Sequence, residues 1–152
     1  MPQGIQSELD EFVMFVKQYF GEHLKSIIVY GSFARGDYNE NSDIDIMILV
    51  TLPESQIKQS ENRIYDAAFD LELKYGKVLS PVIKNHNFFE YWSDTLPFYR
   101  NIKVEGVQVA WQISKKISYF RRNKSIFKRK GIIPLITSET QTGKTEVYHV
   151  SI

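Results

Sequence analysis

The fold is decided by residues 26–50, which read SIIVYGSFARGDYNENSDIDIMILV. Consecutive β-branched residues stopped by Gly31 predict a buried strand over residues 25–30. A second strand is predicted over residues 43–50, which are apolar apart from two aspartates at the start. Between the strands, residues 31–37 read as a glycine turn that leads into a short helical piece. Chemistry is therefore expected in this polar connection.

Asp43 and Asp45 are the first candidates for a metal site. A strand alternates its faces, so residues i and i+2 point the same way, roughly 7 Å apart at a rise of about 3.3 Å per residue. Magnesium prefers oxygen ligands and commonly takes one or two carboxylates, with substrate phosphates and water completing its shell. Two such ions are a known device for displacement at phosphorus. The alternative is a solvated strand start with no metal.

The residues just before this strand suit a phosphate. Gly31 has no Cβ to keep a phosphate away from the backbone, and Ser32 adds a hydroxyl beside backbone amides. Arg35 follows about one turn later and could contact phosphate or pair with a carboxylate such as Asp37. The connection therefore predicts a nucleotide site.

The turn and the second strand resemble the Gly-Ser, Ala-Arg-Gly and Ser-Asp-x-Asp signature of the minimal nucleotidyltransferases of the DNA polymerase β superfamily. The matching residues are Gly31-Ser32-Phe33-Ala34-Arg35-Gly36-Asp37-Tyr38 and Ser42-Asp43-Ile44-Asp45. The layout of residues 7–110 is also similar to that family. The resemblance implies an α+β fold, the nucleotidyltransferase fold, in which helices flank a small mixed β-sheet. It implies that Asp43 and Asp45 are catalytic metal ligands and that the nucleotide is bound by Gly31, Ser32, Arg35 and Ser42.

The resemblance also implies an activity and a partner. Members transfer a nucleoside monophosphate, here most readily AMP from ATP, to a hydroxyl acceptor with two Mg²⁺ ions and release of pyrophosphate. Many are antitoxins paired with a helical HEPN-type toxin, a ribonuclease that they silence by adding AMP to a tyrosine. An aminoglycoside-like small molecule is another acceptor compatible with the signature.

One departure from the family pattern concerns the third carboxylate. It is expected on the strand after the long helix, and residues 77–83 contain no acid. Asp70 and Glu72 lie just before this strand and could substitute. Without a third acid the base that deprotonates the acceptor is missing, so a non-catalytic, nucleotide-binding antitoxin is the alternative.

The remaining pattern places helices around the strands. A helix is predicted over residues 7–20, and a long amphipathic helix runs over residues 54–74 to Gly76. A third strand is predicted over residues 77–84, and a helical stretch interrupted at Pro97 follows. The apolar stripe of the first helix consists of Leu9, Phe12, Val13, Val16 and Phe20.

Charge separates the chain into two parts. Residues 1–110 carry 10 Lys/Arg and 16 Asp/Glu, whereas residues 111–152 carry 9 Lys/Arg and 2 Asp/Glu. This split, together with the resemblance over residues 7–110, predicts a nucleotidyltransferase domain over residues 1–110 and a basic C-terminal extension over residues 111–152. Residues 115–130 combine eight cations with three aromatic rings and could contact RNA. They could equally form a solvated face, dock on an acidic partner, or join the acidic part of a second copy in a homo-oligomer.

The extension offers two more expectations. Residues 107–123 could form a helix or begin with a strand, and residues 132–136 could pair with residues 146–152 as a hairpin. The absence of cysteine excludes disulfides and thiolate zinc sites. The absence of cysteine also suits a reducing compartment, so a cytoplasmic location is expected. No apolar run reaches the roughly 18 residues that span a bilayer, so no membrane contact is expected. A further hypothesis, based on the basic segment 115–130, is an RNA-directed nucleotidyltransferase.

Overall fold

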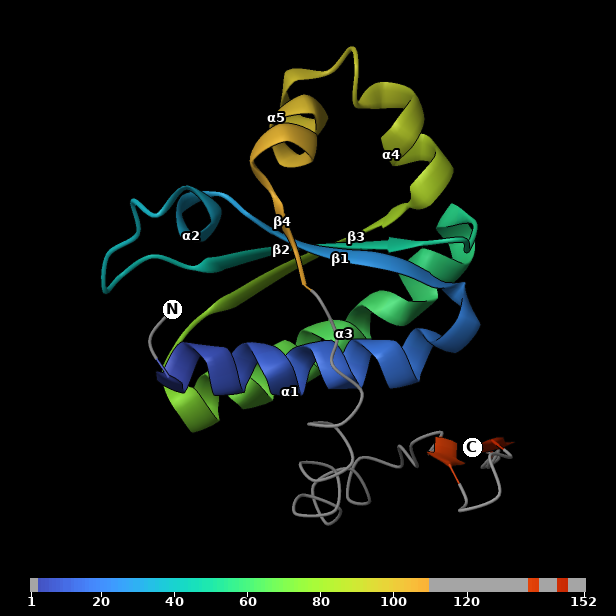
Figure 1. The fold of residues 1–152 in the computed structure, drawn as a ribbon, viewed down its shortest axis with the longest axis horizontal. Coiled ribbons are helices and arrows are strands. Elements are labelled where there is room, and N and C mark those ends of the chain that lie inside the picture. The colour runs from blue at the N-terminus through green and yellow to red at the C-terminus, as the bar shows by residue number, and fades with distance from the viewer. Residues whose placement is uncertain (1–2, 110–136, 140–144, 148–152) are drawn as a thin grey trace. The chain divides into compact units, whose positions relative to one another are not determined.

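The computed structural model describes residues 3–109, 137–139 and 145–147, in two compact units, Met1–Ala110 and Trp111–Ile152. The helices of the first unit are α1 (Gln3–Phe20), the short 3-10 helix η1 (Gly21–His23), α2 (Ser32–Arg35), α3 (Glu54–Tyr75), α4 (His86–Trp92) and α5 (Pro97–Glu105). Its strands are β1 (Leu24–Tyr30), β2 (Ile44–Val50), β3 (Leu79–Asn85) and β4 (Val107–Gln108) (Figure 1).

The four strands form one mixed sheet in the order β3-β2-β1-β4. Strand β1 is antiparallel to both β2 and β4, whereas β2 and β3 are parallel because α3 carries the chain back between them. Helices α1 and α3 cover one face of the sheet, and α4 and α5 cover the other (Figure 1). The predicted α+β fold, a small mixed sheet flanked by helices, is confirmed.

The helices follow the apolar spacing of the sequence. The predicted stripe on α1 is buried throughout, although the helix begins at Gln3, four residues before the predicted start at Ser7. Gly76 ends α3 in the left-handed conformation at φ 78°, as expected of a C-terminal glycine. Strand β3 begins at Leu79, two residues later than predicted. The predicted interruption at Pro97 separates two helices, α4 and α5.

The core between the sheet and the α4–α5 pair fixes the orientation of β2. Its buried residues are Ile28, Met47, Leu49, Phe89 and Ile102, with Tyr30, Val82 and Tyr99 packed against them. Full burial of one such side chain contributes about 1.5–3 kcal/mol. Because side chains alternate along a strand, Asp45 shares its face with Met47 and Leu49. The aspartates therefore face the side of the sheet that carries α4 and α5.

The described part of the second unit is a small hairpin. Strands β5 (Thr137–Glu139) and β6 (Thr145–Val147) are antiparallel, with Thr137 opposite Val147. The predicted hairpin pairs residues 132–136 with residues 146–152. Its first strand lies outside the described residues, and within the described ones Glu146 and Val147 pair with Ser138 and Thr137. The basic segment 115–130 lies outside the described residues. The division into a domain and an extension stays a prediction.

No helix within residues 3–109, the only helical part that is described, is both long enough and apolar enough to cross a bilayer.

Candidate active site

The connection between β1 and β2 opens with a tight turn at Gly31. This residue adopts φ 69° and ψ −148°, a backbone conformation that residues other than glycine rarely adopt. The one-turn helix α2 follows, with the Arg35 amide donating to the Gly31 carbonyl at 3.1 Å and the Gly36 amide to the Ser32 carbonyl at 2.9 Å. Gly31 and Ser32 thus stand where the sequence predicted, at the end of β1.

Strand pairing brings the two aspartates to this turn. In the antiparallel β1–β2 register Tyr30 is opposite Asp45, so Asp45 lies next to the residue that starts the turn. Asp43 is exposed and immediately precedes β2. In the parallel β2–β3 register Ser80 is opposite Asp45, and its hydroxyl donates to Asp43 Oδ2 at 3.4 Å. Gly31, Asp43, Asp45 and Ser80 therefore surround one small region.

The carboxylates of this region repel one another. Burial raises the pKa of Asp45, the charge of Asp43 raises it further, and Arg35 acts in the opposite direction. Burial and the charge of Asp45 also raise the pKa of Tyr30 to about 12, so this phenol stays protonated. A bound cation would relieve the repulsion between the two carboxylates. Two carboxylates on one face are a donor set that magnesium commonly uses, so the residues present fit this ion.

A third acid does not join the pair within residues 3–109. No group of three or more acidic or histidine side chains in this described part could hold a metal. Asp70 and Glu72, the suggested substitutes, belong to α3, which covers the other face of the sheet (Figure 1). The charge of Glu72 acts on Glu8 of α1 instead. The suggestion that they replace the third carboxylate is therefore wrong.

Arg35 was expected either to contact phosphate or to pair with a carboxylate. In the structure it pairs with two carboxylates. Its Nε lies 3.3 Å from Asp37 Oδ2 and its guanidinium 3.8 Å from Glu105 Oε2. About half of each of these side chains is exposed, and such exposed pairs contribute only about 0–1 kcal/mol. Arg35 can therefore leave them for a phosphate at small cost. Glu105 was not expected here, because it lies 70 residues further along the chain and no local motif marks it.

Ser42 supports the loop before the aspartates. Its Oγ accepts from the Asn39 amide at 2.9 Å, and its own amide donates to the Asn39 carbonyl at 3.1 Å. These bonds close a turn that delivers Asp43 to the start of β2. A nucleotide contact through Ser42 stays a prediction.

Lys77 holds the same loop from the β3 side. Its Nζ donates to the carbonyl oxygens of Glu40 at 2.7 Å and Asn39 at 3.4 Å, and it lies 5.5 Å from the centre of the Phe33 ring. That ring in turn stacks on Tyr38, with 4.2 Å between centroids and 8° between planes. Sequence reasoning missed Lys77, since its role depends on β3 lying beside β2.

A family profile and two related sequences all match this chain to nucleotidyltransferases. The profile of the family described as "Nucleotidyltransferase domain" matches residues 9–133. The chain is 35% identical over 104 residues to "Putative protein adenylyltransferase MJ0604" of Methanocaldococcus jannaschii, a match that covers 66% of this chain and 93% of the relative. It is 36% identical over 75 residues to "Putative protein adenylyltransferase MJ0141" of the same organism, covering 49% and 74%.

Two solved structures resemble the chain at low identity. A toxin-antitoxin complex named MntA-HpeT gives a TM-score of 0.41 at 16% identity and covers 80% of this chain and 93% of its own. A toxin-antitoxin with AMP-PNP gives a TM-score of 0.41 at 18% identity and covers 78% and 91%. Likenesses of this size say nothing about activity or partner.

Proposed function

Because the chain belongs to the nucleotidyltransferase domain family, we propose that it transfers AMP from ATP, with Mg²⁺, to a hydroxyl group of a partner protein. The observation that carries this proposal is the close approach of Gly31 to the Asp45 carboxylate, where an added Cβ would lie 2.3 Å from Asp45 Oδ2. This approach would bring the proposed phosphate site next to the proposed metal site. A protein acceptor is supported by the relatives that are named protein adenylyltransferases.

In this mechanism the residues of the connection bind and orient the nucleotide. Backbone amides at Gly31 and Ser32, together with the Ser32 hydroxyl, hold the triphosphate, and Arg35 turns from its weak ion pairs to a phosphate oxygen. Asp43 and Asp45 would hold magnesium, and the Ser80 hydroxyl donates to Asp43 Oδ2. Bound magnesium would favour attack by the acceptor oxygen and neutralise charge on the departing group.

The transfer is an in-line displacement at the α-phosphorus. The acceptor oxygen forms a bond to this phosphorus while the bond to the bridging oxygen breaks, and pyrophosphate leaves with the electron pair. The hydroxyl proton passes to solvent water, since within residues 3–109 no third carboxylate is grouped with Asp43 and Asp45 as a metal-binding set. A general base commonly contributes 10²–10⁴-fold, so the transfer is expected to be slow by roughly that factor.

The partner proposed from the resemblance of the signature is a HEPN-type toxin, with a tyrosine as acceptor. The chain would then act in the cytoplasm as an antitoxin. The second candidate is a non-catalytic antitoxin that binds nucleotide and toxin, and the specific observation in its favour is again the missing third acid. Contact of residues 115–130 with RNA and a small-molecule acceptor stay predictions.

The test isolates the protein with its partner from the native host and adds Mg²⁺ and labelled ATP. We expect label on the partner with the wild-type chain and none with the double variant Asp43→Asn/Asp45→Asn. Asp66→Asn, which removes an exposed acid from α3, is the matched control and should label normally. Label at the wild-type rate with the double variant would refute the site. A partner that binds but stays unlabelled with ATP, GTP, CTP and UTP would establish the non-catalytic antitoxin.

A further inference from the structure

One side of α5 contacts Tyr30 and Arg35 beside the candidate site, and we call this side of the helix a wall of the site. Phe98, Ile102 and Glu105 follow one another at offsets of four and three, so they share a face of the helix. Ile102 is buried in the core with Ile28, which fixes the helix against the sheet. Glu105 reaches the guanidinium of Arg35 at one end of this wall. Phe98 stands at the other end.

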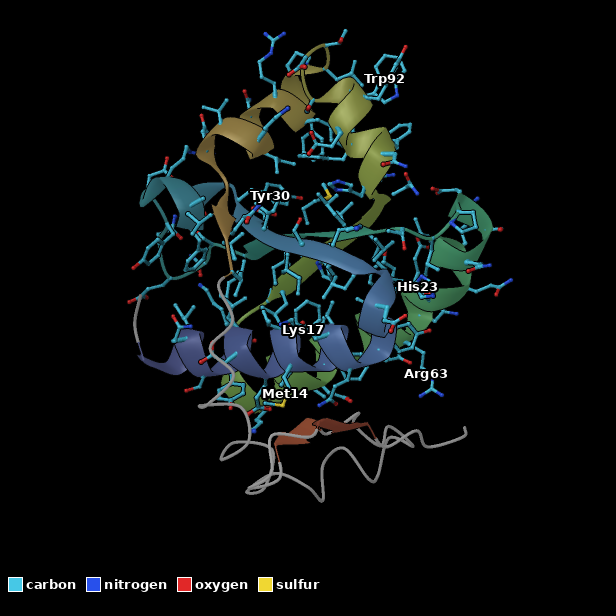
Figure 2. All side chains as sticks on the ribbon, turned by 45° about the vertical axis from the view of Figure 1, so that its right-hand side comes forward. Met14, Lys17, His23, Tyr30, Arg63 and Trp92 are labelled. Atoms are coloured by element: carbon cyan, nitrogen blue, oxygen red, sulfur yellow. The ribbon has the colours of Figure 1, made fainter. Side chains whose placement is uncertain are left out.

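Tyr30 connects Phe98 to the carboxylates. The Phe98 ring meets the Tyr30 ring edge to face, with 5.9 Å between centroids and 88° between planes. Tyr30 is the cross-strand neighbour of Asp45 and lies on the side of the sheet that carries α5 (Figure 2). Directly opposite residues in an antiparallel pair have Cβ atoms about 4.5–5.5 Å apart. A single ring therefore separates Phe98 from the predicted metal site.

Phe98 is exposed although its position is firmly held. Half of its surface, 50%, is open to solvent. The helix that carries it begins with Pro97, whose ring fixes φ, and Tyr99 anchors the same turn through its contact with Phe89 at 5.7 Å. An aromatic ring that is both open and rigid loses little conformational freedom when a second flat ring stacks on it.

Other exposed rings on this side of the molecule lack the same link. Tyr91 is 74% exposed and contacts Trp92, and Phe88 is 45% exposed and contacts Trp92 and Tyr99. These ring contacts stay within α4 and α5. Phe98 differs because its neighbour is a strand residue beside the carboxylates.

We propose that Phe98 is the platform on which the nucleobase stacks when the triphosphate lies at Gly31 and Ser32, an inference that rests on the proposed function. Every base presents a π-face, so such a platform adds affinity without selecting a base. The triphosphate and the metal would then position the reacting phosphorus, while the base is held by α5. The wall formed by α5 would therefore contribute to the affinity for the nucleotide.

The experiment separates base binding from phosphate binding. The full chain is titrated calorimetrically with ATP and with inorganic tripolyphosphate, both with Mg²⁺. Phe98→Leu keeps an apolar side chain but removes the π-face, and we expect it to weaken ATP binding roughly 5- to 100-fold while tripolyphosphate binding is unchanged. Phe98→Tyr should bind ATP as the wild type does. Tyr91→Leu, which removes an exposed ring without a link to Tyr30, is the matched control and should change neither affinity.

The outcomes distinguish this inference from the proposed function. Equal ratios of ATP to tripolyphosphate affinity in wild type and Phe98→Leu would overturn the platform while the phosphate site stands. Loss of both affinities in Phe98→Leu would also overturn it, since the side chain would then be supporting the phosphate site. A wild-type chain that binds neither compound would overturn the proposed function and the platform with it. Phe98→Trp gives a second readout, because its added fluorescence should be quenched by ATP and not by tripolyphosphate.

Discussion

Gly31 and Asp45 are so close that a Cβ at position 31 would lie 2.3 Å from Asp45 Oδ2. Gly31 also adopts φ 69°, where a side chain is strained in any case. The cause is the register that places Tyr30 opposite Asp45, because it sets the carboxylate against the first residue of the turn. Glycine is therefore required at this position both for the turn and for the space that the carboxylate occupies.

The first prediction concerns this contact. Gly31→Ala should displace the Asp45 carboxylate and lower the rate of transfer at least about 100-fold, since misplacement of a reacting group by about 1 Å has effects of that order. The backbone strain should lower the free energy of unfolding by about 1–3 kcal/mol. Labelled ATP measures the first effect and thermal unfolding the second.

Gly36→Ala is the control for backbone strain. Gly36 adopts φ 83°, and a Cβ there would meet nothing within 4 Å. The Gly36→Ala protein should lose about as much free energy of unfolding as Gly31→Ala does. It should nevertheless keep most of its transfer activity. Equal losses of activity in the two variants would show that strain, and not contact with Asp45, explains the effect.

The second prediction concerns the lysine that holds the loop. Lys77→Met removes the hydrogen bonds to the Glu40 and Asn39 carbonyls, so the loop before Asp43 should loosen. We expect the affinity for Mg²⁺ in the presence of ATP to fall about tenfold and the free energy of unfolding to fall by about 1–2 kcal/mol. Lys58→Met, on the exposed surface of α3, should leave both unchanged. Normal magnesium affinity in Lys77→Met would contradict the role given to the loop contact.

The third prediction uses the serine beside the aspartates. Ser80 donates to Asp43 and is opposite Asp45, so Ser80→Asp would place a third carboxylate at the pair. Without magnesium the added charge should lower the melting temperature, because three like charges repel. With magnesium the melting temperature should recover and transfer should become faster. Ser80→Asn adds similar bulk without the charge, and an identical response of the two variants to Mg²⁺ would refute the prediction.

The fourth prediction concerns a buried carboxylate away from the site. Glu8 of α1 is fully buried, and neither of its oxygens has a hydrogen-bond partner. Burial raises its pKa to about 7 from an ordinary 4.5, Lys77 lowers it, and Glu72 and Glu11 raise it. Between these pH values the folded chain keeps a proton that the unfolded chain releases. The free energy of unfolding therefore falls as pH rises from 4.5 to about 7, by at most about 3 kcal/mol.

Replacing this carboxylate should flatten the dependence on pH. Glu8→Gln cannot ionise, so its gain in stability over the wild type should be absent near pH 4 and reach its full value near pH 8. Denaturant unfolding across this range measures the effect. Asp10→Asn, on the exposed side of the same helix, should leave the slope between pH 4.5 and 7 unchanged. A parallel profile for Glu8→Gln and wild type would show that Glu8 does not titrate in this window.

The sequence by itself determined the elements and the polar connection. Apolar helical spacing, runs of β-branched residues and turn glycines are local signals that span only a few residues. The strands at residues 25–30 and 43–50 and the turn at Gly31 were therefore predictable. The i, i+2 spacing likewise placed Asp43 and Asp45 on one face, because it depends only on the pleat of a strand. Element ends were less certain, as the early start of α1 and the late start of β3 show.

Only the tertiary structure decided which distant residues complete the site. Ser80 and Lys77 reach the aspartate loop because β3 is parallel to β2 in one particular register. Phe98 contacts Tyr30 and Glu105 contacts Arg35 because Ile102 anchors α5 in the core. None of these neighbours has a local signal, since contacts between residues far apart in sequence depend on strand register and helix packing. Those are set by burial of the whole apolar surface and not by any short stretch of sequence.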